Sequence, residues 1–433
     1  MPLKHNIKKV ELKNGAKGII VDSPESSVFC YEINFRAGNR YVKSPEIQQT
    51  AHLLEHLAFN GTKEYPTPEK FSQIFTENGA YNNASTYEMG ISYFGGSADF
   101  EAERILDLQG KAICQPNFDE ETLEKEKKTV REELTGQATN YYRLLWSNLV
   151  KSMNPNIFTD AEKIETIDKI SLDDITEHHQ RTHTTKNMRF VLGGDLNNKK
   201  LNHMLAQIEA FELPLGRCFE IEKSKFKKAE DPIRIYNKQV NNLYFYLIMN
   251  LNRKLGVREE YVLRALNHVL TATFHSRIFG KARQQGICYA VTSGGGYSVD
   301  DTSDFFFASQ VTPENSLKLY DLIITELNKI VKEGITEEEL SAIKRYSFGE
   351  FQQVGQTVGA LVGYYSSYFY EDDIVELKEV SEIINSIKKE EIKDLASEFI
   401  NSGIWGFGEL GNITEAKNKK AYNKFAKELF KEK

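Results

Sequence analysis

Apolar and polar residues alternate along several short stretches in the N-terminal half of the chain. Alternation with a period of two is typical of strands that bury one face, and it predicts strands at residues 27–35 and 86–95. The segment 10–21 is interpreted in the same way, as a pair of strands. The N-terminal half is therefore expected to contain a sheet.

Apolar residues at helical spacing predict three helices in the same half. Residues 66–77 have prolines near the start and Asn78-Gly79 at the end, which are helix start and stop signals. Residues 99–114 carry apolar side chains at helical spacing. Asn117 to Asp119 caps a further helix that continues through Leu134.

A fourth predicted helix carries an unusual set of polar residues, in the stretch Thr50-Ala-His52-Leu-Leu-Glu55-His56. His52 and His56 are four residues apart and Glu55 follows His52 by three, so the three side chains lie on one helical face. Two imidazoles on one face can share a metal ion, and a carboxylate beside them suits metal-assisted hydrolysis. The order H-x-x-E-H is the inverse of the commoner H-E-x-x-H zinc signature.

The simpler interpretation of this helix is an amphipathic core helix with two surface histidines. Against it, the polar side chains stand among Leu53, Leu54 and Leu57, where uncompensated polar groups are costly. Zinc also requires a third protein ligand. Glu126 and Glu133 are seven residues apart in a predicted helix and share one face. Taken alone, that segment is interpreted as a solvated charged helix, because it is rich in Glu and Lys.

The second half of the chain repeats patterns of the first. Residues 334–350 echo residues 117–133 at an offset of 217. A repeat of this length is too long for a solenoid and fits two α/β domains of the same fold. We expect these domains at residues 1–215 and 216–433.

The repeat does not include the metal motif. At the corresponding place the second half has His268-Val-Leu-Thr-Ala272, which keeps one histidine but lacks the glutamate and the second histidine. One domain is therefore expected to hydrolyse and the other to help in binding. His268 is interpreted as a packed core histidine.

Composition sets the class of protein. The 433 residues are 40% hydrophobic and 27% charged, which describes a soluble globular chain with ample core. The net charge of −7 gives no broad basic field for nucleic acid, and no apolar run reaches the roughly 18 residues of a membrane span. The N-terminus lacks a signal peptide, so we expect a cytoplasmic protein without membrane partners. The cysteines are scattered, which predicts buried free thiols at Cys30, Cys114, Cys218 and Cys288.

The combination of H-x-x-E-H with a glutamate 77 residues beyond His56 resembles the pitrilysin/insulinase family of zinc peptidases, the inverzincins. Its relatives include insulin-degrading enzyme and mitochondrial processing peptidase. The family motif H-F-L-E-H-M-A-F-K-G-T is matched from His52 to Thr62. The resemblance implies one Zn²⁺ per chain, with Glu55 as general base and Glu126 as an accessory glutamate. The implied metal ligands are His52, His56 and Glu133.

The resemblance also implies residues that bind substrate. The family's N-A-x-T before an edge strand is matched by Asn83-Ala84-Ser-Thr, so Asn83 and Ala84 are expected to contact the substrate backbone. The segment 276–289 resembles the family's R-x-K-x-G-L-x-Y, which implies that Arg283 and Tyr289 stabilise the oxyanion. Its Arg-to-Tyr interval is one residue shorter than the family's. The ordinary alternatives are a surface arginine and a strand tyrosine.

The implied fold class is α+β, with two homologous α/β domains in tandem that form half of a clamshell. Each domain would have a mostly antiparallel sheet with helices packed on one face. A homodimer would restore the four domains of larger members, and Arg283 and Tyr289 of one subunit would then complete the other's site. A heterodimer with a zinc-less homologue is the competing arrangement.

The implied function is a zinc-dependent endopeptidase that hydrolyses oligopeptides or unfolded segments inside an enclosed chamber, with zinc-activated water and Glu55 as base. The alternative is a non-catalytic scaffold, or a subunit of a heterodimeric processing peptidase. Two further clusters receive a structural interpretation. The histidines of residues 177–183 lie at a polar helix end, with a second metal site as the minor alternative. Gly294 to Gly296 is interpreted as letting strands approach closely, with a substrate-contacting loop as the alternative.

Overall fold

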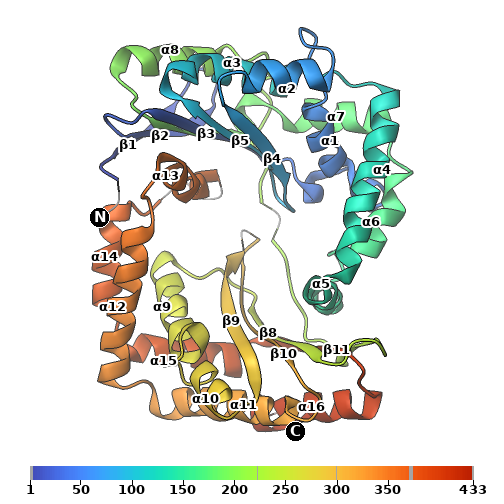
Figure 1. The fold of residues 1–433 in the computed structure, drawn as a ribbon, viewed down its shortest axis with the longest axis vertical. Coiled ribbons are helices and arrows are strands. Elements are labelled where there is room, and N and C mark those ends of the chain that lie inside the picture. Colours follow the sequence, from blue (N-terminus) through green and yellow to red (C-terminus); the bar gives the residue numbers. More distant parts are fainter. Residues whose placement is uncertain (1–2, 222, 299, 370–373, 432–433) are drawn as a thin grey trace. The chain divides into compact units, whose positions relative to one another are not determined.

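The computed structural model describes residues 3–221, 223–298, 300–369 and 374–431 (Figure 1). The chain forms two compact units, neither of which is continuous in sequence. The first unit comprises Met1–Thr135, Glu162–Ile221 and Gln352–Leu377. The second comprises Gly136–Ala161, Glu222–Phe351 and Lys378–Lys433. Each half of the chain thus contributes a segment to the other half's unit, across the boundary that the sequence predicts near residue 215.

The first unit is built on a six-stranded sheet in the order β1-β2-β6-β3-β5-β4. Only β2 and β6 pair in parallel, and β4 forms an edge. The strands are β1 (Asn6–Glu11), β2 (Lys17–Asp22), β3 (Val28–Phe35), β4 (Tyr81–Thr86), β5 (Ile91–Ala98) and β6 (Met188–Gly194).

Helices from the first half of the chain pack on one face of this sheet and share its apolar core. They are α1 (Thr50–Ala58), α2 (Pro68–Thr76), α3 (Ala102–Cys114), α4 (Glu120–Gly136), α6 (Asp160–Ile167), α7 (Leu172–Thr182) and α8 (Asn198–Glu209).

The second unit has a five-stranded sheet in the order β7-β11-β8-β10-β9. This order repeats that of the first sheet from β2 to β4, including one parallel pair, β7 with β11. Its strands are β7 (Ile233–Tyr236), β8 (Leu243–Leu251), β9 (Cys288–Ser298), β10 (Thr302–Val311) and β11 (Ile404–Gly411). Its helices from the second half are α9 (Val257–Asn267), α10 (Phe279–Gln284), α11 (Ser316–Glu333), α12 (Glu337–Gln353), α14 (Leu377–Ser386), α15 (Lys389–Asn401) and α16 (Glu415–Glu428).

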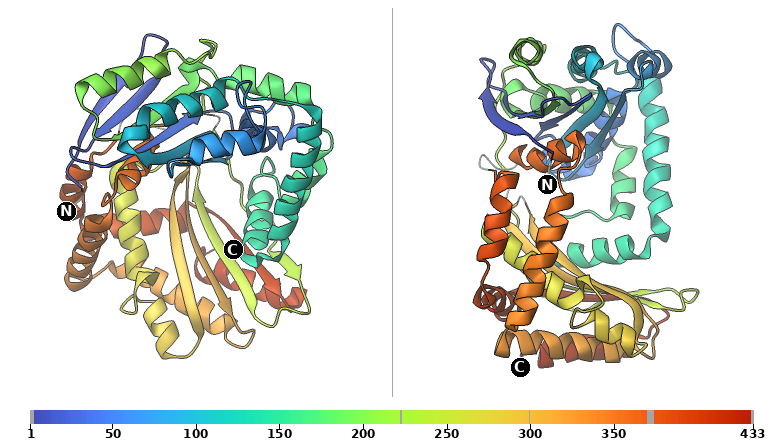
Figure 2. Two further views of the ribbon diagram at one scale, coloured as in Figure 1. Left: turned by 45° about the horizontal axis from the view of Figure 1, so that its top comes forward. Right: turned by 60° about the vertical axis from the view of Figure 1, so that its left-hand side comes forward.

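A helix from the second half, α13 (Val358–Tyr365), packs on the other face of the first unit's sheet. In β6, Phe190 and Leu192 point into the core. Because successive residues of a strand face opposite sides of the sheet, Gly193, which follows Leu192, faces away from this core. A Cβ atom at Gly193 would lie 2.6 Å from Val362 of α13. The glycine therefore lets the helix approach the strand closely. Figure 2 shows the sheet of the first unit between α13 on one face and the helices from the first half of the chain on the other.

The second unit likewise contains a helix from the other half of the chain. The helix α5 (Tyr141–Met153), from the first half, packs on β11 and β8. Here Gly406 and Gly408 face the helix, and added Cβ atoms would lie 2.7 Å from Met153 and 3.0 Å from Leu145. The alternation of glycine with buried Trp405 and Phe407 thus gives β11 one face for the core and one for α5.

The predicted fold class, two units with mostly antiparallel sheets and helices packed on them, is confirmed. The strand pair within 10–21 and the three helices also agree with the structure. The strand predicted at 86–95 is confirmed from Ile91 onward, where β5 begins, but its predicted start is wrong, because a turn in which Tyr87 N–H bonds to Gly90 O separates β4 from β5. Cys218 is exposed, contrary to the expected buried thiol. No helix in the described ranges has the length and apolar character to cross a membrane.

Candidate metal centre

The helix α1 separates its apolar and polar residues onto two faces. Ala51, Leu53, Leu54 and Leu57 are fully buried in the core of the first unit. The residues of the H-x-x-E-H motif are only partly buried and lie on the other face. Because the leucines anchor the helix, the three polar side chains are held in a fixed relation to one another.

The three predicted metal ligands come together from two helices. One ligand atom from each of His52, His56 and Glu133 lies within 4.8 Å of the others. Oε2 of Glu133, on α4, is 3.5 Å from Nε2 of His52 and 3.9 Å from Nε2 of His56. The imidazole rings are 4.9 Å apart and nearly perpendicular.

This arrangement fits a zinc ion. Around tetrahedral zinc with bonds of about 2.0–2.1 Å, two ligand atoms lie about 3.4 Å apart. The observed separations from Glu133 are close to that value. Two imidazole nitrogens and one carboxylate oxygen are also a usual donor set of a zinc site with an open position. Among the described residues, no other set of three His, Cys, Asp or Glu side chains meets the same spacing.

His56 is fixed by Glu126, the predicted accessory glutamate. Nδ1 of His56 donates a hydrogen bond of 2.8 Å to Oε2 of Glu126, which turns Nε2 toward Glu133. Burial disfavours the charged ring, but the hydrogen bond and the nearby carboxylates outweigh it and raise the pKa of His56. The same hydrogen bond lowers the pKa of Glu126.

Asn60, just beyond the end of α1, holds Glu126 in turn. Its Nδ2 donates to Oε1 of Glu126 at 3.2 Å and to the carbonyl oxygen of His56 at 3.1 Å. The carboxylate is therefore held on both oxygens, one by the imidazole and one by the amide.

Glu55, the predicted base, lies beside the histidines and next to the end of β4. Burial raises the pKa of Glu55, and hydrogen bonds from the hydroxyl and backbone N–H of Thr86 oppose the rise. Thr86 is the last residue of β4, so the edge strand and the carboxylate are tied together.

The two residues predicted to contact substrate lie on β4. Asn83 is exposed, and its Oδ1 accepts the backbone N–H of Ala84 at 2.9 Å. The side chain of Ala84 is buried in the core, so only its backbone is available to a ligand. Since β4 pairs with β5 alone, its outer edge offers backbone hydrogen-bonding groups.

Arg283 and Tyr289 lie in the second unit, on α10 and β9. The Arg283 guanidinium stacks over the Tyr289 ring at 4.5 Å from its centroid, and Tyr289 is 81% exposed. The structure thus pairs these two residues with each other on the surface.

The counterpart of the metal motif in the second unit has other contacts. His268 begins a short π-helix, and its ring centroid lies 4.2 Å from that of Tyr346 of α12, with the rings tilted by 50°. Thr271, at the place of the base, hydrogen-bonds to Asn267 and Ser293. The side chains at this position therefore serve the packing of the second unit.

The histidines of residues 177–183 are used within the fold. His178 and His179 donate to the carbonyl oxygens of Ala37 and Ile113, at 2.7 and 2.8 Å. His183 is fully buried and hydrogen-bonds to the Tyr93 hydroxyl at 2.9 Å. These bonds support the structural interpretation.

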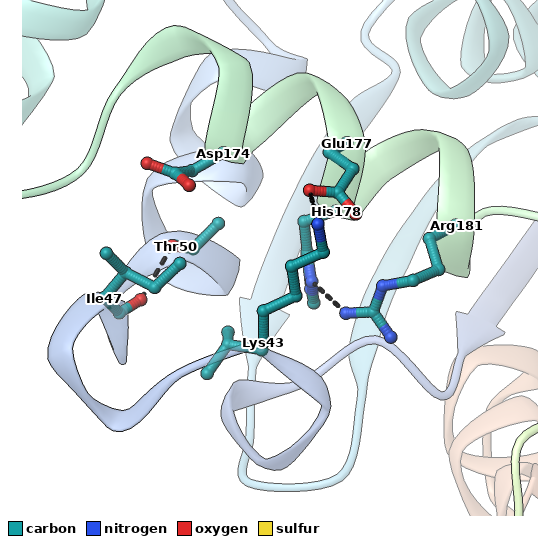
Figure 3. A pocket seen from close by; sticks show the side chains of 8 residues that line it. Lys43, Ile47, Thr50, Asp174, Glu177, His178 and Arg181 are labelled. Carbon is teal, nitrogen blue, oxygen red and sulfur yellow. Dashed lines mark hydrogen bonds and ion pairs between the residues drawn. The ribbon is translucent and has the colours of Figure 1, made fainter.

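The hollow beside His178 is drawn in Figure 3, where Arg181 reaches its ring and Lys43 pairs with Glu177. Its volume of about 10 Å³ leaves room for about one water molecule, so it does not accommodate a substrate. The glycine-rich segment of β9 packs against β10 as expected, since a Cβ at Gly295 would lie 2.0 Å from the Asp304 carbonyl oxygen.

Three residues of this centre were missed in the sequence, namely Asn60, Thr86 and Gln49, whose Oε1 lies 3.1 Å from Nδ1 of His52. Gln49 precedes His52 by three residues and Asn60 follows His56 by four. Both intervals place side chains on the same helical face, so helical spacing was the available signal. The contact of Thr86 with Glu55 depends on tertiary packing and leaves no such local signal.

Two family models and several known proteins match this chain. The family model described as "Insulinase (Peptidase family M16)" matches residues 20–158, and "Peptidase M16 inactive domain" matches residues 169–346. An uncharacterized zinc protease of Bacillus subtilis, YmxG, is 24% identical over 79% of this chain and 83% of its own. A Helicobacter pylori protein named "Non-peptidase homolog YmxG" is 24% identical over 92% of this chain and 96% of its own.

A solved structure of a protease from Helicobacter pylori has the same fold. Its TM-score is 0.84 at 21% sequence identity, over 95% of this chain and 100% of that one. Residues 169–346 of this chain thus match a domain described as inactive, and they do not include the H-x-x-E-H motif.

Proposed function

The chain belongs to the insulinase family of peptidases, peptidase family M16, and from this premise we propose that it is a zinc-dependent endopeptidase. The proposed substrates are oligopeptides or unfolded segments. The observation that carries the proposal is the meeting of His52, His56 and Glu133, with the partly buried carboxylate of Glu55 beside them.

One zinc ion per chain would be held by Nε2 of each histidine and by the carboxylate of Glu133. Zinc, when bound, supplies a Lewis acid that lowers the pKa of a water molecule to roughly 7 and polarises the scissile carbonyl. Glu126 orients His56 through Nδ1 and keeps Nε2 available.

Glu55 is the residue that transfers a proton from the attacking water to the leaving amine. Its carboxylate accepts a proton from the attacking water as the water oxygen bonds to the carbonyl carbon. It then donates that proton to the amine nitrogen as the C–N bond breaks. Burial, which raises its pKa, makes this carboxylate a stronger base, and the hydrogen bonds from Thr86 keep its ionised form populated and oriented.

The substrate would add an extended segment to the outer edge of β4, with backbone hydrogen bonds supplying much of the affinity. Asn83 is exposed on this strand and is proposed to contact the substrate backbone. Arg283 and Tyr289 are proposed to bind the developing oxyanion, for which a guanidinium and a phenol are suited. Their mutual stacking supports a joint role, because it orients the guanidinium in advance.

We further propose a homodimer in which Arg283 and Tyr289 of one subunit complete the site of the other. In a twofold dimer the same exchange would occur at both sites. A heterodimer with a zinc-less homologue is the alternative arrangement.

A second candidate function is a non-catalytic scaffold, since one relative of similar length is named a non-peptidase homologue. Against it, this chain keeps the complete set of metal ligands, the base and the accessory glutamate. These residues lie in mutual contact rather than dispersed.

The test combines zinc content with hydrolysis of a quenched fluorescent peptide. Wild type is expected to bind zinc and cleave. Glu55→Gln is expected to keep zinc and lose turnover by roughly three orders of magnitude or more. Undiminished cleavage by Glu55→Gln would reject Glu55 as the base. Zinc binding by wild type without cleavage of any peptide in a diverse library would favour the scaffold.

A further inference from the structure

Gln49 immediately precedes α1 at the helix N-cap position, yet its side chain makes no capping hydrogen bond. Glutamine is not among the residues preferred there, which are Ser, Thr, Asp and Asn. The residue is nevertheless only 1% exposed, and its neighbour Gln48 only 3%. Burying two amides is costly unless each is hydrogen-bonded. The choice of residue therefore requires a reason other than helix capping.

The side chain of Gln49 contacts the first metal ligand. Its Oε1 lies 3.1 Å from Nδ1 of His52. The neighbouring amide fixes which atom faces the ring, because Nε2 of Gln49 donates to Oε1 of Gln48. The atom facing His52 is consequently the oxygen, an acceptor, so Nδ1 of His52 must carry the proton. Nε2 of His52 then has the lone pair, and this is the atom that faces Glu133.

We propose that Gln49 is a positioning residue of the metal centre, which holds His52 in the tautomer and orientation that present Nε2 to zinc. The inference rests on the proposed zinc site. Gln49 does for His52 what Glu126 does for His56, with one difference. A neutral amide accepts from the first ring and a carboxylate from the second.

A purely structural role for Gln49 has a matched comparison in the same unit. Gln109 is fully buried on α3, and its Oε1 accepts a hydrogen bond of 2.7 Å from the Tyr31 hydroxyl. Loss of either amide is expected to cost stability. Only the loss of the Gln49 amide, and not that of Gln109, is expected to lower the zinc affinity.

The experiment measures zinc affinity of the full chain by competition with a chromophoric chelator. Gln49→Leu is expected to bind zinc about 10–100-fold more weakly than wild type. Gln109→Leu is expected to keep wild-type affinity. Gln49→Glu, which restores an acceptor of the same length, is expected to bind at least as tightly as wild type. Equal affinity of Gln49→Leu and Gln109→Leu would overturn the inference.

A second measurement decides the question without a variant at Gln49. The ring ¹⁵N and ¹H signals of His52 in the zinc-free protein, assigned by their loss in His52→Ala, are expected to show the proton on Nδ1. A proton on Nε2 would overturn the inference and leave the proposed function intact. If wild type bound no zinc at all, the proposed function would fall, and this inference with it.

Discussion

Glu126 on α4 accepts a 2.8 Å hydrogen bond from Nδ1 of His56 on α1, although the two residues are 70 positions apart in the chain. The bond joins the two helices that supply the candidate ligands, so the charged helix is part of the candidate metal centre. Asn60 binds the second oxygen of the same carboxylate.

Glu126→Gln is expected to weaken zinc binding by about 10–100-fold, because an amide is a poorer acceptor for the imidazole N–H and lowers its basicity. Chelator competition measures the change. Glu121→Gln is the control, since Glu121 lies on the same helix, is exposed and forms an ion pair with Lys125 at 2.7 Å. Equal affinities of the two variants would show that the bond to His56 does not support the metal.

Glu409 predicts a pH-dependent stability of the second unit. It is buried between the Tyr320 hydroxyl, at 2.7 Å, and Nδ2 of Asn418, at 2.9 Å. Burial raises its pKa from 4.5 to about 7, against the effect of both hydrogen bonds. Between these values the folded chain keeps a proton that the unfolded chain releases, so the free energy of unfolding falls as pH rises.

Urea unfolding between pH 4.5 and 8 measures this effect. Relative to Glu409→Gln, wild type is expected to lose up to about 3 kcal/mol across the window. Glu415→Gln, an exposed glutamate at the start of α16, should leave the wild-type slope unchanged. If wild type and Glu409→Gln had parallel pH profiles, Glu409 would not titrate in this range.

The close packing of α13 on Gly193 is expected to contribute to the stability of the chain. A Cβ atom there would lie 2.6 Å from Val362 and 2.9 Å from Val358. Gly193→Ala is therefore expected to destabilise the chain by about 1–3 kcal/mol, through overpacking against α13. Gly349→Ala in α12, where an added Cβ meets nothing within 4 Å, should stabilise by up to about 1 kcal/mol. Denaturant unfolding of both variants checks this, and a neutral Gly193→Ala would argue against the close packing of α13.

The proposed dimer predicts complementation between two inactive variants. Glu55→Gln lacks the base and Tyr289→Phe lacks the phenol. If Tyr289 acts in the partner's site, each mixed dimer has one intact site, and an equal mixture should recover about a quarter of wild-type turnover. Sedimentation of wild type tests whether the proposed dimer forms. A mixture that stays inactive would contradict action across subunits.

The sequence was most informative where the relevant geometry is local. Helical spacing placed His52, Glu55 and His56 on one face, and a two-turn interval aligned Glu126 with Glu133. The contact between these two helices came from the resemblance, because the charged helix alone favoured a solvated interpretation. The structure brings its Glu133 to both histidines.

Other features depend on long-range packing and were not predictable in the same way. The placement of α5 and α13 in the unit of the other half is signalled in the sequence by glycines in β6 and β11, whose use becomes evident only when the helices that pack on them are known. The strand expected at 86–95 was predicted to start too early, because apolar alternation continued across the turn that precedes β5. Gln49 was overlooked because a glutamine before a helix has no evident use until its direction toward His52 is known.

Zinc stoichiometry in Glu133→Gln tests the central claim most directly, because it asks whether two helices share one ion. Glu132→Gln is the matched control, since Glu132 is the adjacent exposed glutamate of the same helix. After dialysis against the same zinc buffer, wild type and Glu132→Gln are expected to contain one zinc per chain and Glu133→Gln essentially none. Full zinc content in Glu133→Gln, or none in wild type, would contradict the account.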